Sequence, residues 1–480
     1  MPSQEFGLSR LIVRPTEAPL LAFASPTPDA TPVWLVSAEN WPTVKSTIGA
    51  AAATFAERCG FQPKAGSMQL LPNEAGALAG VLFGVDEANA PTRDPFGPGK
   101  LATSLPEGVY GFANPPQDAD LAALGFLLAL YRYDRFKADR GPKPRLVAPD
   151  EVDAIRIQRI AEAIAYGRDL VNTPANSLGP NALEQEAVKL AEHFDASVTM
   201  VRGDELIAAN FPLIHAVGRA GAEEPRIVDF SWGRDDAPKV AIIGKGVTFD
   251  TGGLDIKPAS GMELMKKDMG GAATALTLAR LIMETGLDLR LRAVIPIVEN
   301  AISAPAMRPG DVIVSRKGIS VEVGNTDAEG RMILADALAL ADEDAPELML
   351  DFATLTGAAR VALGPDLPPF YTDDDALAGS IASHAARARD PVWRMPLWRP
   401  YDAMIEGSVA DISNSGSGGG MAGSITAALF LRRFVEKTRS WAHFDVYAWN
   451  PKPRAHGPTG GEVQAARGLF ELLCERYPRR

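Results

Sequence analysis

From about residue 150 to its C-terminus, the sequence alternates short apolar runs with longer amphipathic stretches. The apolar runs indicate strands, which we expect at residues 226–231, 239–248, 291–298, 320–323, 348–354 and 442–447. The amphipathic stretches have helical periodicity and are expected to be helices at residues 150–171, 271–284, 331–342, 376–389, 424–436 and 461–475. This alternation predicts a mainly parallel sheet with helices on both faces. Ligands bind such a sheet outside the carboxyl ends of its strands.

The first part of the chain has a different pattern. Between residues 10 and 136, short apolar runs are broken by proline and glycine, and the last 18 positions form an amphipathic stretch over residues 119–136. This pattern is typical of a small α/β domain. Residues 137–149 are charged and contain prolines, as linkers often do. We therefore expect an α/β fold with two domains: an N-terminal α/β domain with its linker over residues 1–148, and a larger α/β catalytic domain with a mainly parallel central sheet covered by helices over residues 149–480.

Composition limits the partners and the compartment. The 480 residues include 48 Lys and Arg against 60 Asp and Glu, and the resulting net charge of −12 makes nucleic acid an unfavourable partner. Two cysteines are too few for a disulfide framework. The N-terminal residues lack the apolar run of a secretory signal, and no run of about 18 apolar residues follows, so we expect a cytoplasmic protein with no membrane partner. None of the five histidines has the i, i+4 spacing that would place two of them on one face of a helix. Any metal site must therefore depend on carboxylates.

Charged residues gather after several of the expected strands. Taken singly they indicate little, because Asp, Asn and Gly are ordinary turn formers and lysine is usually solvated. Asp327 and Glu329 lie two positions apart, and in an extended segment both side chains would point to the same side. Together with Asp250 and Asp268, they would place four carboxylates in one site.

Four crowded carboxylates would repel one another, and their pKa values would rise until some of them became neutral. Two divalent cations would remove that penalty and keep the carboxylates ionised. Oxygen ligands without cysteine or paired histidines suit Mg²⁺ or Mn²⁺ and also accommodate Zn²⁺. Two such ions would hold a water between them, lower its pKa and polarise a substrate carbonyl.

At these residues the sequence resembles the leucyl aminopeptidase family of two-metal cytosolic exopeptidases. The signature NTDAEGR stands at residues 325–331, and the pattern GKG-x-x-FD-x-GG stands at residues 244–253. Asn172-Thr173-Pro174, the segment TLTGA at residues 354–358 and the intervals between the charged residues also follow the family order. Several independent motifs in one order are far more specific than any single one. The resemblance covers roughly residue 150 to the C-terminus, whereas the N-terminal domain resembles the macro-type folds of the family only loosely.

The resemblance implies a role for each of these residues. It implies that Lys257 stabilises the oxyanion of the tetrahedral intermediate, and that Arg331 anchors a bicarbonate ion that takes a proton from the attacking water. Asp250 and Glu329 would bridge the two metals. The full set of metal ligands implied by the family comprises Lys245, Asp250, Asp268, Asp327 and Glu329.

The resemblance also implies the substrate and the assembly. A free α-amine of the substrate would bind one metal, so the enzyme would remove only the N-terminal residue of small peptides. Its side-chain pocket would consist of Met265, Thr354 and Gly357 and would suit an apolar residue such as Leu or Met. Tyr447 and Trp449 replace the small residues that usually follow the last strand, and we expect them to add bulk near the pocket wall. The implied assembly is a homohexamer, and the implied cofactors are two Mn²⁺, Zn²⁺ or Mg²⁺ ions with bicarbonate.

Two other functions stay open at this point. The chain could be a catalytically idle scaffold or a DNA-binding regulator, although its complete ligand set and its negative charge oppose this. Alternatively, its N-terminal domain could bind a nucleotide-like ligand, although no phosphate-binding motif supports that reading.

Overall fold

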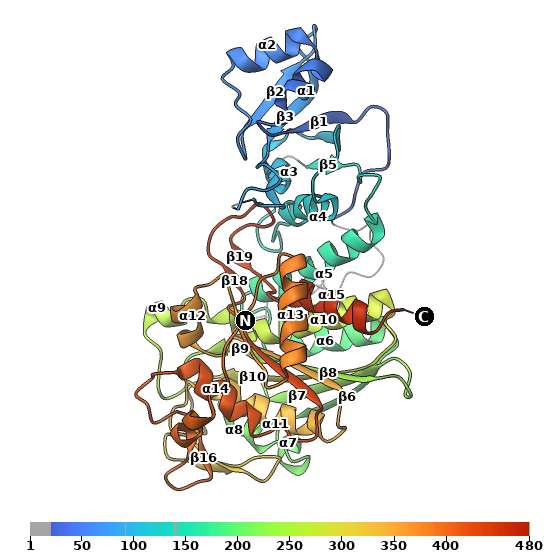
Figure 1. The fold of residues 1–480 in the computed structure, drawn as a ribbon. Coiled ribbons are helices and arrows are strands. Elements are labelled where there is room, and N and C mark those ends of the chain that lie inside the picture. Colours follow the sequence, from blue (N-terminus) through green and yellow to red (C-terminus); the bar gives the residue numbers. More distant parts are fainter. Residues whose placement is uncertain (1–20, 92, 139–140, 142, 480) are drawn as a thin grey trace, which may run out of the picture. The chain divides into compact units, whose positions relative to one another are not determined.

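The structure is a computed structural model that describes residues 21–91, 93–138, 141 and 143–479 (Figure 1). The N-terminal stretch in which we saw no secretory signal thus lies almost wholly outside the described residues. The chain divides into two compact units, a smaller one of residues 21–165 with Lys452–Thr459 and a larger one of Tyr166–Pro451 with residues 460–479. The domain boundary expected between residues 148 and 149 stays a prediction. In the described part of the chain, every helix is too short or too polar to cross a membrane.

The smaller unit contains a five-stranded sheet with the strand order β2-β3-β1-β4-β5. Strand β1 runs parallel to both β3 and β4, and β4 runs parallel to β5, whereas β2 is antiparallel to β3. The strands are β1 (Thr31–Val36), β2 (Met68–Pro72), β3 (Leu78–Gly84), β4 (Gly108–Phe112) and β5 (Pro144–Leu146). The helices are α1 (Trp41–Ile48), α2 (Ala50–Arg58), η1 (Gly97–Lys100), α3 (Leu101–Ser104) and α4 (Ala119–Leu130). The α/β character expected for this part of the chain is confirmed.

The larger unit contains a nine-stranded sheet with the order β15-β14-β17-β13-β8-β10-β7-β6, and β9 pairs with β10. Its centre, β17-β13-β8-β10, is parallel, and antiparallel strands flank it. The strands are β6 (Ser197–Arg202), β7 (Arg226–Trp232), β8 (Lys239–Gly244), β9 (Gly246–Asp250), β10 (Arg290–Asn300), β13 (Leu348–Ala353), β14 (Pro369–Tyr371), β15 (Trp393–Arg394) and β17 (Ser440–Asp445). The smaller sheets comprise β11 (Val312–Val314), β12 (Ser320–Glu322), β16 (Ile412–Ser413), β18 (Trp449–Asn450) and β19 (Gly460–Gly461).

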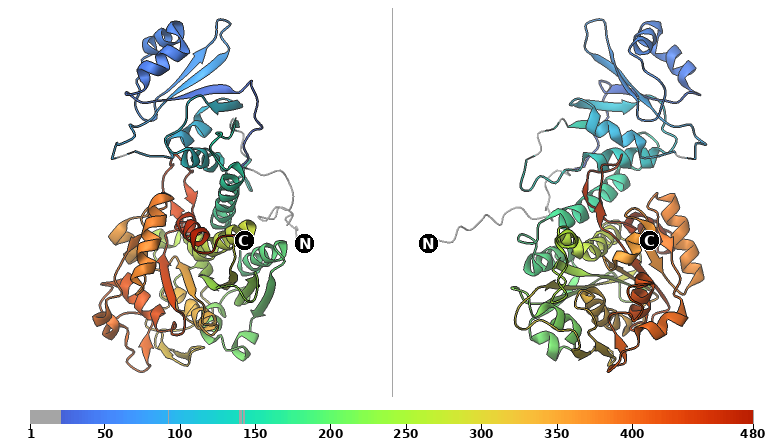
Figure 2. Two further views of the ribbon diagram at one scale, coloured as in Figure 1. Left: turned by 45° about the vertical axis from the view of Figure 1, so that its right-hand side comes forward. Right: turned by 90° about the vertical axis from the view of Figure 1, so that its left-hand side faces the viewer.

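Helices cover both faces of this sheet (Figures 1 and 2). Ala241 and Ile243 of β8 belong to one buried cluster with Ile333 of α11, whereas Ile242, which points to the opposite face, is buried on the side of α10. This period of two explains why β8 is apolar throughout. The helices are α5 (Ala154–Asn172), α6 (Pro180–His193), α7 (Glu205–Ala208), α8 (Pro212–Gly218), α9 (Ala259–Met262), η2 (Met265–Met269), α10 (Gly270–Thr285), α11 (Glu329–Asp342), α12 (Gly357–Leu363), α13 (Asp375–Arg387), η3 (Arg399–Ile405), α14 (Gly423–Arg432) and α15 (Ala466–Arg476).

Some expected elements have other bounds in the structure. The strand expected at residues 239–248 is divided at Lys245, whose backbone N–H donates to Phe352 of β13, and the chain then continues as β9 beside β10. The last helix starts at Ala466 rather than at residue 461, because Gly460 and Gly461 pair with β18. Helix α14 ends at Arg432 rather than at residue 436, because the backbone N–H groups of residues 436–438 donate to the carboxylate of Asp342.

Candidate metal centre and active site

The charged residues that follow the parallel strands meet in the larger unit. Lys245 lies between β8 and β9, and Asp250 is the last residue of β9. Asp268 lies in η2, and Glu329 is the first residue of α11. Lys245 and Asp250 directly follow strands of the nine-stranded sheet, whereas β12, which precedes Glu329, belongs to the separate three-stranded sheet, so the strand expected at residues 320–323 is not part of the central sheet.

Lys245 lies at the centre of one buried group. Its Nζ is 2.8 Å from Asp268 Oδ2 and 2.8 Å from Glu329 Oε1, and it also donates to the carbonyl of Thr354 at 3.1 Å. Gly330 permits this approach, because a Cβ at that position would lie only 2.7 Å from Lys245 Nζ. Burial alone would lower the pKa of the Lys245 ammonium, but the surrounding carboxylates outweigh burial and raise it above its usual range.

Lys257 belongs to a second group beside the first. Its Nζ lies 2.8 Å from Asp250 Oδ2 and forms a very short ion pair with Asp327 Oδ1. Each of Asp250, Asp327 and Glu329 has a carboxylate oxygen within 4.8 Å of the others. Among the described residues, no other His, Cys, Asp or Glu side chains form a group of three with this geometry.

The crowding of these carboxylates has electrostatic consequences. Burial and the negative charge of Asp268 raise the pKa of Asp250 despite the two neighbouring lysines. Burial and the charge of Asp250 raise the pKa of Glu329 to about 8. The Oε2 atom of Glu329 is buried and accepts no hydrogen bond from any described residue, which is costly for a carboxylate. This set of oxygen atoms fits a divalent cation, which would compensate both the repulsion and the missing donors.

The structure brings Asp327 and Glu329 together by a route that differs from the predicted one. The prediction of an extended segment was wrong, because Asp327 lies in a turn and Glu329 is the first residue of a helix. Thr326 holds this turn in place: its N–H donates to Asp255 Oδ2 at 2.7 Å, and its hydroxyl donates to the carbonyl of Gly252 at 2.6 Å. Contacts between two distant loops, rather than strand geometry, therefore position the two carboxylates.

Arg331 lies two residues beyond Glu329 in the first turn of α11. Its side chain is buried, and burial lowers its pKa to about 10. One nitrogen, Nη1, donates to the carbonyl of Asn414 at 2.7 Å, whereas Nε is buried and has no acceptor among the described residues. A guanidinium with an unused donor could bind a small planar anion.

Two supporting asparagines were missed in the sequence. Asn300, at the end of β10, donates to Asp250 Oδ1 at 2.8 Å and to the carbonyl of Thr326 at 3.1 Å. Asn414 accepts the N–H groups of Gly324 at 2.8 Å and Asn325 at 3.1 Å, and so braces the loop that carries Asp327. Asn300 could have been found as a polar residue at a strand end, whereas the glycine-rich surroundings of Asn414 carry no such signal.

One of the residues predicted to form the substrate pocket contacts the metal centre. Met265 begins η2, three positions before Asp268, and Gly357 begins α12. Thr354 follows β13 and donates its hydroxyl to Asp268 Oδ1 at 2.7 Å. Thr354 is therefore the predicted pocket residue that contacts a predicted metal ligand.

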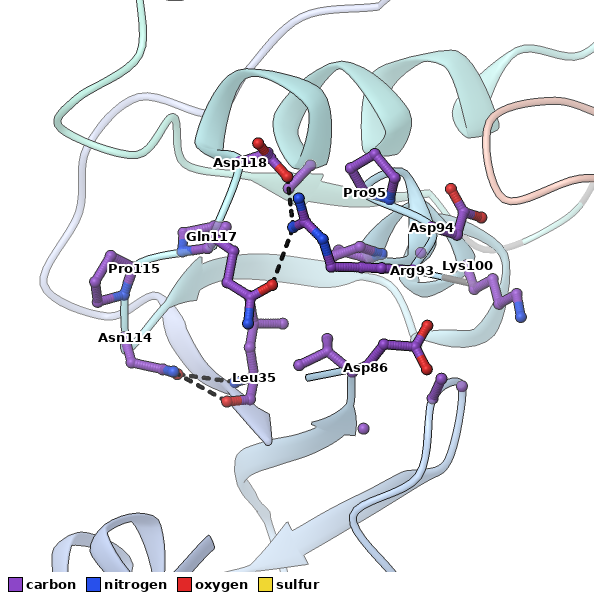
Figure 3. Close-up of a pocket in the computed structure, with 18 of the residues that line it drawn as sticks. Leu35, Asp86, Arg93, Asp94, Pro95, Lys100, Asn114, Pro115, Gln117 and Asp118 are labelled. Carbon is purple, nitrogen blue, oxygen red and sulfur yellow. Dashed lines mark hydrogen bonds and ion pairs between the residues drawn. The ribbon is translucent and has the colours of Figure 1, made fainter. Parts of the chain in front are cut away.

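A hollow of about 160 Å³ lies in the smaller unit, beyond the carboxyl ends of β1, β3 and β4 (Figure 3). Arg93 Nη1 there lies 2.5 Å from Asp118 Oδ2 and 2.9 Å from Gln117 Oε1. The side-chain amide of Asn114 accepts the N–H of Leu35 at 2.8 Å and donates to its carbonyl at 3.0 Å. Several polar groups of this lining thus bind one another, unlike the crowded carboxylates of the larger unit.

Comparison with known proteins gives a consistent result over both units. Residues 165–468 match the cytosol aminopeptidase family, catalytic domain, and residues 31–149 match the M17 aminopeptidase, N-terminal domain. A probable cytosol aminopeptidase of Nitratidesulfovibrio vulgaris is 41% identical over 382 residues, which are 75% of each chain. The crystal structure of a cytosol aminopeptidase from Coxiella burnetii has a TM-score of 0.90 at 41% identity and covers 95% of this chain and 99% of its own. The bottromycin maturation enzyme BotP, in complex with Mn, has a TM-score of 0.82 at 32% identity and covers 93% of this chain and 99% of its own.

Proposed function

This chain belongs to the cytosol aminopeptidase family, and from that premise we propose that its carboxylate cluster is the centre at which it hydrolyses the N-terminal residue from small peptides. Family membership makes the chain a metal-dependent peptide hydrolase. The number of metals and the role of each residue are our proposal. Two divalent ions would be held by Lys245, Asp250, Asp268, Asp327 and Glu329, with Asp250 and Glu329 between them.

One observation carries this proposal. Oxygens of Asp250, Asp327 and Glu329 lie within 4.8 Å of one another in a mostly buried site, although like charges repel. The neighbouring ammonium groups of Lys245 and Lys257 offset part of this repulsion, but Glu329 Oε2 still has no donor. Divalent cations would complete the compensation.

Lys245 must lose a proton before it can act as a ligand, because an ammonium has no lone pair. Its carboxylate neighbours now favour the charged form. Cations bound to those same carboxylates would neutralise them and remove this preference, while burial would continue to favour the neutral amine. Metal binding at this site should therefore release protons.

The other charged side chains have distinct roles in this proposal. When bound, the two ions would supply Lewis acidity and lower the pKa of a water molecule. Lys257 pairs with carboxylates that the metals would neutralise, but its side chain is 15% exposed against 3% for Lys245, so burial would favour its neutral form less and it would remain the cation that stabilises the oxyanion on the substrate carbonyl. Arg331 would hold bicarbonate, which supplies a proton acceptor, and the free Nε donor supports this assignment.

Several finer points are proposals of the same kind. The neighbouring BotP structure contains Mn, which supports Mn²⁺ over Zn²⁺ or Mg²⁺ for this chain. A homohexameric assembly and a cytoplasmic location follow only from the family resemblance and the names of its members. The apolar preference predicted for Met265, Thr354 and Gly357 is a separate question, because it depends on the pocket wall rather than on the metal ligands.

The first experiment is hydrolysis of amino-acid p-nitroanilides by chelator-stripped protein, before and after addition of Mn²⁺, Zn²⁺ or Mg²⁺. We expect activity only with metal and only on substrates with a free α-amine, so N-acetylated substrates are the control. Cleavage of the acetylated substrates, or equal activity without metal, would contradict the proposal.

The metal ligands are tested in the same protein by metal analysis. Asp250→Ala and Glu329→Ala should each lose both ions or bind them in disturbed positions, because each residue contacts both ions in the proposed arrangement. Asp235→Ala is the matched control, because the Asp235 side chain is 93% exposed and is not part of the carboxylate cluster. Unchanged metal content in both ligand variants would exclude the bridging roles.

A further inference from the structure

Two cationic side chains lie beside the ring of Tyr447, which follows β17. Lys267 Nζ is 4.8 Å and Arg360 Cζ is 5.1 Å from the centroid of that ring. The loop is fixed by Gln464 Oε1, which accepts the N–H groups of Tyr447 at 2.8 Å and Ala448 at 3.3 Å. Ala448 has a φ of 57°, a conformation uncommon for a residue with a side chain. We call Lys267, Arg360 and Tyr447 together the cationic wall.

The cationic wall borders the predicted substrate pocket. Gly357 and Arg360 are three positions apart in α12, and a Cβ at Gly357 would lie 3.8 Å from Arg360 Nη2. On the other side, Thr354 approaches the loop that carries Tyr447. A Cβ placed at Gly270 would lie 3.1 Å from Thr354 Cγ2 and only 2.2 Å from Ala448 Cβ. Gly357 thus adjoins the wall, and Thr354 lies near the loop that carries Tyr447.

Neither cation has a counter-ion among the described residues. Lys267 is only 2% exposed, yet its Nζ forms no hydrogen bond or ion pair in the described part of the chain. The Nη1 atom of Arg360 is also buried without an acceptor. Burying an ammonium without an anion is unfavourable, and burial lowers the pKa of Lys267 to about 7, although the face of Tyr447 offsets part of that cost. The charge of the wall therefore lies mainly on the guanidinium of Arg360.

The carboxylates nearest to these cations are engaged elsewhere. Asp268 pairs with Lys245 at 2.8 Å and accepts the hydroxyl of Thr354 at 2.7 Å. Asp445 accepts the hydroxyl of Thr356 at 2.6 Å together with two backbone N–H groups. An anion that pairs with Arg360 would therefore come from outside the wall.

A substrate side chain in the pocket would lie beside these unpaired donors. A carboxylate could accept charge-assisted hydrogen bonds from Arg360, whose guanidinium geometry matches it. A leucine side chain would leave the buried Nη1 donor of Arg360 unpaired. On the basis of the aminopeptidase function proposed above, we propose that the cationic wall selects peptides whose N-terminal residue carries a side-chain carboxylate, Asp or Glu. This differs from the apolar preference that the family resemblance predicts.

The test compares kcat/KM for dipeptides of the form X-Ala by the metal-loaded, full-length protein. Glu against Gln and Asp against Asn isolate the charge, because each pair has nearly the same shape, and Leu and Met represent the apolar alternative. We expect Glu and Asp to exceed their amides and Leu by at least about tenfold, since a buried donor left unpaired is strongly discriminating.

Variants of Arg360 test the residue itself. Arg360→Leu should lower the Glu/Leu ratio of kcat/KM by about tenfold or more, whereas Arg360→Lys retains the charge without the bidentate geometry and should lower the ratio by less than Arg360→Leu does. Val361→Ala is the matched control, because Val361 lies in the same helix and is 91% exposed. It should leave the ratio unchanged.

The outcomes separate this inference from the proposed function. Metal-dependent cleavage with Glu equal to Gln and below Leu would overturn the acidic preference and leave the aminopeptidase intact. An unchanged Glu/Leu ratio in folded Arg360→Leu would remove Arg360 from specificity. If no free-amine substrate is cleaved with any metal, the proposed function fails and the preference fails with it. If Arg360→Leu does not fold, the Glu/Gln and Asp/Asn comparisons on the unaltered protein still test whether the enzyme prefers an acidic N-terminal residue.

Discussion

The hydroxyl of Thr354 contacts Asp268 twice: it lies 2.7 Å from the carboxylate oxygen Oδ1 and 2.9 Å from the backbone carbonyl oxygen of the same residue. The carbonyl of Thr354 also accepts Lys245 Nζ at 3.1 Å. One residue just past the end of β13 thereby orients two predicted metal ligands from two other segments.

Removing this hydroxyl should weaken metal binding. Thr354→Val keeps the shape of the side chain but leaves Asp268 Oδ1 without its donor, and groups that orient ligands typically contribute about 10- to 100-fold in metal affinity. Calorimetric titration of the stripped protein with Mn²⁺ measures this loss. Thr354→Ser retains the hydroxyl and should stay within a few-fold of the unaltered protein. Equal affinity in the valine variant would show that this orientation does not matter.

Loss of Lys257 should lower the catalytic rate and leave the metal content unchanged. Lys257→Ala removes the cation that pairs with Asp250 and Asp327, and two bound metals would satisfy those carboxylates in its place. We expect a loss of roughly 10²- to 10³-fold in kcat, the scale of losing one oxyanion donor. Metal analysis and kcat should be measured on the same preparation. A variant with its full rate would remove Lys257 from the mechanism.

Asn414 should position Arg331 and the loop that carries Asp327. Asn414→Ala removes the acceptor for the Gly324 and Asn325 N–H groups, so the loop and the carbonyl that binds Arg331 lose their support. We expect kcat to fall by about 10- to 100-fold at saturating metal. Ser417→Ala, an exposed change in the same glycine-rich segment, is the control and should keep its rate. A similar fall in both variants would indicate general loosening of the segment.

Asp342 should contribute to stability in a pH-dependent way. Its oxygens accept three backbone N–H groups and the hydroxyl of Thr438, and these bonds, which outweigh burial, hold its pKa below the usual range. Asp342→Asn should lower the free energy of unfolding by about 1 to 3 kcal/mol at pH 7.

The sign of the pH dependence follows from the lowered pKa. A carboxylate whose pKa is lower in the folded state stabilises that state above its unfolded pKa of about 4, and loses this contribution as the pH falls through the folded value. The difference between Asp342→Asn and the unaltered protein should therefore be constant from pH 8 to 5 and shrink below about pH 4. Urea unfolding at several pH values measures it. A difference that persists at pH 3 would assign the effect to packing instead.

Much of the fold could be predicted because it depends on short-range patterns. The apolar run of β8 and the helical periodicity of α10 and α11 lie in continuous segments, so their type and approximate place follow from side-chain period alone. The bounds were less accurate where a distant partner decides them. Gly460 and Gly461 are an example, because pairing with β18 excludes them from the last helix.

The sequence alone identified the residues that we propose carry the chemistry, because metal ligation needs carboxylates and their motifs are continuous in the chain. The tertiary structure decided how those residues meet. Thr326 and Asp255, 71 positions apart, form the turn that places Asp327, and Asn300 holds Asp250 from another strand. The sequence marked Tyr447 as added bulk, but Lys267 and Arg360 carry no signal in their own segments, and the three residues form the cationic wall only when folding brings them together. The physical reason is that burial and electrostatic pairing depend on distances through space, which the order of residues along the chain does not contain.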